Sequence, residues 1–100
     1  MTATLYQPGQ PPQSLPADQF SLPDAAGRAQ VTQAVADALG CAVGLVDVLA
    51  SGPDYVAYSI FDSEGEVNMD AMKALAEIVG QSFNDLDNDE LVRGNVLTIN

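Results

Sequence analysis

Gly40 divides a helical pattern of apolar residues from a β-strand pattern, and this division constrains the fold of the chain. The apolar residues before it recur at helical spacing: Val31, Ala34, Val35, Ala38 and Leu39. Asp24 can cap such a helix, because a short carboxylate side chain accepts a hydrogen bond from a free amide of the first turn. Gly40 can end it, because glycine adopts the left-handed conformation at no steric cost. The sequence therefore predicts a helix between Asp24 and Gly40.

The segment after Gly40 predicts a β-hairpin. Residues 43–49 form a nearly continuous apolar run rich in valine, which is typical of a well-buried strand. Residues 51–54 are turn formers, and residues 55–61 alternate in the manner of a second strand. Asp47 is the one charge in the first strand, and we interpret it as facing solvent or lying at a sheet edge. The alternative is a buried carboxylate with a shifted pKa, which would need a partner.

A second helix and a last strand complete the predicted domain, which spans residues 24–100. Asn68 can cap the helix, and residues 95–99 read as the strand. The apolar face of this helix consists of Met69, Met72, Leu75, Ala76, Val79 and Phe83. The predicted fold class is α+β, with two helices packed on one face of a small antiparallel sheet. The arrangement would be ferredoxin-like, either βαββαβ or αββαβ, with an extended N-terminal arm.

Residues 1–23 form that predicted arm. Five of the six prolines lie here, and proline disfavours helix both at its own position and at the one before it. The arm could be a disordered tail, or an ordered segment that docks on a partner through Tyr6, Leu15 and Phe20. Residues 2–6 could instead add an edge strand to the sheet. We favour the docking arm, because a purely solvating tail does not need spaced apolar anchors.

The net charge of −11, from 14 acidic and 3 basic residues, limits the possible partners. It argues against direct binding to nucleic acid or to an anionic membrane surface, since both need lysine and arginine. It permits a basic protein partner, a cation or simple solubility. No apolar run approaches the length of a membrane span, and the first residues lack the layout of a secretion signal. We expect a cytoplasmic protein or a component of a particle assembled there, such as a virion.

No catalytic or cofactor motif stands out. The chain has no histidine, no nucleophile elbow and no phosphate-binding glycine loop. Its single cysteine, Cys41, reads as a small core residue. Two acidic stretches, residues 62–70 and 85–90, resemble calcium loops, but neither has the glycine and closing glutamate of an EF-hand at the right positions. We therefore predict no enzyme activity, no cofactor and no metal site.

The stretch from Val31 to Ile60 resembles the first part of SEA modules. The matching residues are Ala38-Leu39-Gly40, then Val43 to Leu49, then Ser51-Gly52, then Tyr55-Val56-Ala57-Tyr58. The resemblance covers about half of the chain and implies a βαββαβ fold with an adhesive or assembly role. Some SEA modules cleave themselves between glycine and serine at this turn. Because Pro53 follows Gly52 here, the resemblance does not imply that cleavage.

Two functional hypotheses follow from these features. The first is a non-enzymatic structural or interaction protein: a small acidic subunit that docks into a larger assembly through its N-terminal arm. The assembly could be a virus or phage particle, and the protein could form a homo-oligomer. The second is an acidic inhibitor that imitates nucleic acid in a basic groove of a partner protein. Its predicted surface consists of Asp62, Glu64, Glu66, Asp70, Asp85, Asp87, Asp89 and Glu90.

Overall fold

The computed structural model describes residues 1–26, 28–29, 31–61, 66–79 and 92–100. The two helices are α1 (Gln33–Leu39) and α2 (Met69–Val79), and two single 3₁₀ turns are η1 (Ala17–Gln19) and η2 (Val43–Leu45). The strands are β1 (Ala3–Tyr6), β2 (Gln13–Leu15), β3 (Val46–Gly52), β4 (Tyr55–Ile60) and β5 (Val96–Ile99). The described residues thus form a small α+β fold, as the sequence predicts.

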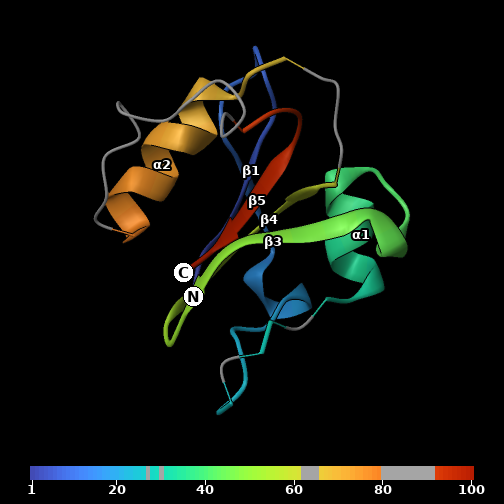
Figure 1. The fold of residues 1–100 in the computed structure, drawn as a ribbon, viewed down its shortest axis with the longest axis vertical. Helices are drawn as coiled ribbons and strands as arrows, with labels where there is room; N and C mark the ends of the chain where they lie inside the picture. The colour runs from blue at the N-terminus through green and yellow to red at the C-terminus, as the bar shows by residue number, and fades with distance from the viewer. Residues whose placement is uncertain (27, 30, 62–65, 80–91) are drawn as a thin grey trace.

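The five strands form one sheet in the order β2-β1-β5-β4-β3, and every pairing is antiparallel. β1 and β5 are neighbours in the middle of the sheet, although they lie at opposite ends of the chain (Figure 1). Thr2 and Asn100 extend this pairing, because the backbone amide of each donates a hydrogen bond to the carbonyl oxygen of the other. β2 and β3 therefore form the two edges of the sheet.

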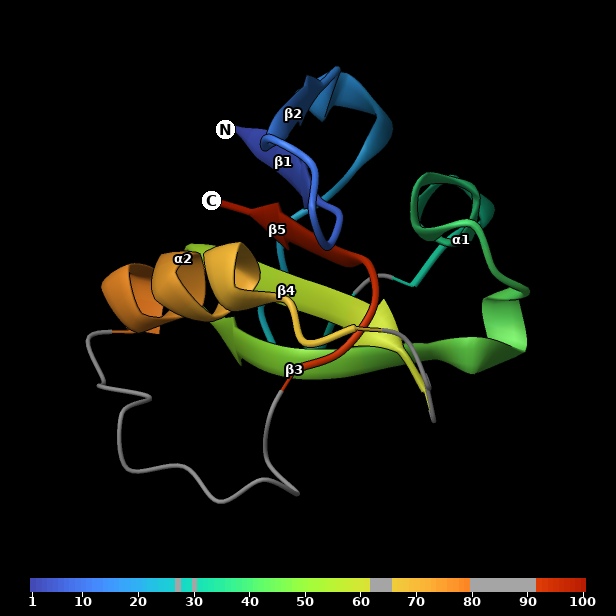
Figure 2. The same ribbon diagram turned by 90° about the horizontal axis from the view of Figure 1, so that it is seen from above.

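The two helices pack on opposite faces of this sheet (Figure 2). The first core, here called the α1-side core, consists of Ala3, Leu5, Phe20, Val35, Leu39, Val56, Tyr58, Leu97 and Ile99. The second, the α2-side core, consists of Ala57, Ala71, Met72, Leu75, Val92 and Val96. Along β4, Val56 and Tyr58 point to α1 while Ala57 points to α2, as the alternation of a strand requires.

The prediction of two helices on one face is therefore wrong, and so is the ferredoxin-like arrangement. A split βαβ unit joins parallel strands, whereas every strand pair described here is antiparallel. The physical reason lies in the strands. β4 and β5 carry apolar residues on both faces, so each face needs its own cover.

Helix α1 begins later than the sequence predicts and ends at the expected residue. Its N-cap is Thr32, whose hydroxyl accepts a hydrogen bond from the Val35 amide. Asp24 instead closes a local turn, because its carboxylate accepts from the amides of Ala26 and Arg28 at 2.9 Å each. Gly40 ends the helix with φ of 80°, which confirms the predicted left-handed cap.

Helix α2 starts at the predicted cap. The Asn68 carboxamide oxygen accepts a hydrogen bond from the Ala71 amide at 3.2 Å, and Asn68 itself is buried. Met72 and Leu75 face the sheet as predicted, but Met69 is 55% exposed. Met69 is the first residue of the helix, where its side chain lies beyond the end of the packed face. The predicted contribution of Phe83 lies outside the described residues.

The N-terminal segment is part of the domain, which corrects the predicted boundary between an arm and a core at residue 23. β1 lies between β2 and β5, and Leu5 and Phe20 are buried in the α1-side core. The alternative that residues 2–6 add a strand is closer to the structure, although β1 is an interior strand. The segment joins the domain because its spaced apolar residues bury area against the sheet, which stabilises a small core.

Candidate interaction surface

The two edges of the sheet differ in length and in chemistry. β2 has only three residues, and prolines precede and follow it at positions 12 and 16. Short strands and prolines both discourage pairing with another chain. β3 has seven residues without proline, and no described strand pairs with its outer edge. Among the described residues, the β2 edge is thus poorly suited to further pairing, and the β3 edge has no strand beside it.

Large apolar side chains are exposed along the open edge. We define the β3 edge surface as Val43, Leu45, Val48, Leu49 and Phe61. Phe61 joins this group because its backbone amide donates a 2.7 Å hydrogen bond to the carbonyl oxygen of Leu45. Phe61 is 62% exposed, and Val48 and Leu49 are 39% and 36% exposed. Apolar side chains gathered at an open strand edge are typical of a protein-binding surface.

This surface corrects the prediction of a well-buried strand over residues 43–49. The first part of that run forms the η2 turn, and β3 begins only at Val46. Because β3 is an edge strand, no described strand covers one of its sides. A β-bulge at Leu49 further interrupts its register with β4. An apolar run can therefore indicate either burial inside one protein or burial against another.

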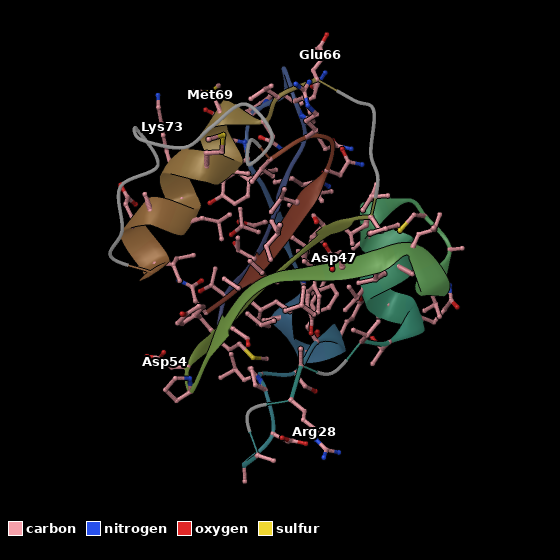
Figure 3. The ribbon with its side chains drawn as sticks, in the orientation of Figure 1. Arg28, Asp47, Asp54, Glu66, Met69 and Lys73 are labelled. Atoms are coloured by element: carbon pink, nitrogen blue, oxygen red, sulfur yellow. The ribbon has the colours of Figure 1, made fainter. Side chains whose placement is uncertain are left out.

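Asp47 is the second residue of β3 and is exposed, which confirms the interpretation that it faces solvent or lies at a sheet edge (Figure 3). It pairs with Ser59 across the β3–β4 ladder. A second carboxylate, Asp54, lies at the tight turn between the two strands (Figure 3). Residues 43–61 contain no lysine or arginine. The open edge is thus apolar and acidic.

An open hollow of about 530 Å³ lies at the end of β3. It is lined by residues 23–26 on one side and residues 51–53 on the other. The lining includes the acidic residue Asp24 and two prolines, Pro23 and Pro53. The hollow is therefore continuous with the last residues of β3 and shares the chemistry of the edge.

The three predicted arm anchors contact the protein's own core. Phe20 is buried in the α1-side core, and Leu15 packs against that core from β2. Tyr6 is half-buried and packs against the α2-side core. The buried side chain of Phe20 therefore stabilises the domain, and Leu15 and Tyr6 are partly buried against the two cores.

The predicted acidic surface is only partly described. Glu66 and Asp70 are both exposed near the start of α2. The other six residues of that prediction lie outside the described residues: Asp62, Glu64, Asp85, Asp87, Asp89 and Glu90. Among the residues that the structure describes, no three histidine, cysteine or carboxylate side chains gather closely enough to hold a metal ion.

Cys41 follows the end of α1 and is half-buried against the α1-side core. Burial raises the pKa of its thiol. A raised pKa reduces the thiolate fraction at neutral pH, which is the opposite of what a nucleophilic cysteine requires. This environment agrees with the interpretation of Cys41 as a packing residue.

No described helix has both the length and the apolar character that a membrane span requires. Comparison of the chain with protein-family models, with curated proteins and with solved structures gives no match. The exposed surface of the described residues is therefore the basis for a functional proposal.

Proposed function

We propose that this chain is a non-enzymatic interaction protein, a small acidic subunit that joins a larger protein assembly. The observation that carries the proposal is a group of five exposed large apolar side chains at the β3 edge of the sheet: two in β3, two in η2, and Phe61 directly after β4. Exposed apolar area costs free energy in water, and a partner that covers it recovers about 25 cal/mol for each Å². The contact is assigned to the β3 edge surface instead of the N-terminal residues, because those residues already pack inside the domain.

The proposal is tested by the native mass of the chain purified from its source at moderate salt. We expect a stoichiometric complex larger than the monomer. Val48→Lys should dissociate it, because a charged side chain on the β3 edge surface would be buried in the contact. Met69→Lys is the matched control, since Met69 is also exposed and the change in charge is the same.

The outcomes separate the proposal from its alternatives. A free monomer in the source, or equal effects of Val48→Lys and Met69→Lys, would contradict it. An interaction that depends on Glu66 and Asp70 and weakens steeply with salt would favour the nucleic-acid mimic.

A further inference from the structure

We infer that the outer edge of β3 binds an extended segment of a partner protein, which adds to the sheet as a further strand and alternates apolar with basic residues. This inference rests on the proposed function, because it names the way in which the subunit would join its partner. It goes beyond that function by specifying the backbone geometry and the side-chain chemistry of the partner segment.

The backbone of β3 suits strand addition. An edge strand presents amide and carbonyl groups that have no partner on its outer side, and an extended peptide can satisfy them. β3 spans seven residues without proline, Val46–Gly52, although the bulge at Leu49 interrupts their alternation. The β2 edge offers three residues between prolines, so it cannot hold a strand of useful length.

The two faces of β3 call for different side chains on the added strand. Val48 pairs with Tyr58 and therefore lies on the α1 side of the sheet. Asp47 pairs with Ser59 and lies on the α2 side. Side chains of an added strand alternate between the same two faces, and directly opposed side chains on neighbouring strands interact. The added strand should thus place apolar residues on the side of Val48 and a lysine or arginine on the side of Asp47.

Charge favours a basic partner segment over a second copy of this chain. Between residues 43 and 61 the charged residues are Asp47 and Asp54, and the whole chain carries −11. Two copies joined at β3 would bring two such acidic edges together, whereas a basic segment would neutralise one.

The test uses the full chain and a labelled peptide of the same length as β3 that alternates valine with lysine. Its binding is measured by fluorescence anisotropy against the same peptide with glutamate in place of lysine. We expect the lysine peptide to bind at least about tenfold more tightly, and Asp47→Lys to remove or reverse that preference. Asp70→Lys, which changes an exposed carboxylate on α2, should leave the preference unchanged.

Two further measurements distinguish strand addition from charge attraction alone. A lysine peptide with proline at its centre should bind weakly, because proline removes an amide donor and the extended pairing. Amide hydrogen exchange should slow in Val46–Gly52 when the lysine peptide binds. Equal binding of the two charged peptides, or no loss with proline, would overturn the inference. A dimer of the free chain whose β3 amides are already protected would also overturn it, because the occupant would be a second copy.

If the native complex exists and Val48→Lys disrupts it while the peptides show no preference, the proposed function stands and the mode of binding is wrong. If the native chain is a monomer and Val48→Lys has no effect, the proposed function itself is wrong.

Discussion

The side-chain amide of Asn68 donates a 2.9 Å hydrogen bond to the carbonyl oxygen of Tyr6, 62 positions earlier in the chain. The same amide donates to the carbonyl oxygen of Gly94 at 2.8 Å, while the Asn68 oxygen caps α2. One buried side chain therefore connects the end of β1, the start of α2 and the approach to β5.

We expect Asn68→Ala to lower the free energy of unfolding by about 3 kcal/mol, because it leaves buried carbonyl groups and a helix amide without partners. Asn95→Ala is the matched control. Asn95 makes one described side-chain hydrogen bond, to the carbonyl oxygen of Leu39, so the loss should be about 1 kcal/mol. Urea unfolding measures both, and equal losses would contradict the central role of Asn68.

Removal of the N-terminal segment should unfold the protein. Deletion of residues 1–15 takes away β1, the interior neighbour of β5, together with β2. In the full-length chain, Leu5→Ala and Phe20→Ala should each cost about 3 kcal/mol, because both side chains are buried in the α1-side core. Met1→Ala, at an exposed position, should change stability by less than about 0.5 kcal/mol. A deleted chain with native circular dichroism and cooperative unfolding would restore the idea of an independent arm.

Replacement of Thr98 by valine should stabilise the protein. Thr98 is buried in β5, and its hydroxyl oxygen has no hydrogen-bond partner among the described residues. Exchange of that hydroxyl for a methyl group removes the cost of burying an unpaired polar group, and we expect a gain of about 1 kcal/mol. Thr2→Val, at an exposed position, serves as the control. A loss of stability in Thr98→Val during thermal unfolding would mean that the hydroxyl is satisfied in solution.

Gly40→Ala should destabilise α1 although there is room for the added methyl group. No atom lies within 4 Å of the added carbon, but φ is 80°, where residues with a Cβ are strained. We expect a loss of about 1 kcal/mol. Gly44→Ala is the matched control, since its site is equally open and its φ lies outside the left-handed region. Equal effects of the two substitutions would show that backbone strain is not the cause.

Local signals in the sequence predicted the structure where one residue decides the geometry. Gly40 and Asn68 end and begin helices as expected, and the hairpin turns at Pro53 and Asp54, within the predicted turn residues 51–54. Asp47 was expected at an edge, and β3 is an edge strand. In each case one residue of distinctive chemistry decides the local geometry, so no distant contact is needed to predict the result.

Long-range arrangement was not predictable from the same patterns. Asp24 has the chemistry of a helix cap, yet Thr32 performs that role and Asp24 closes a turn. The apolar residues of the N-terminal segment could contact a partner or their own sheet, and only the pairing of β1 with β5 decides between them. The apolar residues up to Leu49 indicated that this segment would be buried, but not whether the protein's own core or a partner would cover it. The β3 edge surface was therefore not predicted. Asp47 within that run was the signal that could have revealed it.

The pairing of β1 with β5 also sets the order in which the protein can form. During synthesis β1 leaves the ribosome first, but its central neighbour consists of residues 96–99. β1 can pair with β2 soon after residues 13–15 are synthesised. Its pairing with β5 is possible only after residues 96–99 are synthesised. Contacts of such long sequence separation slow folding and prolong the exposure of unpaired strands. A protein with this topology depends on the final strand to make its fold cooperative.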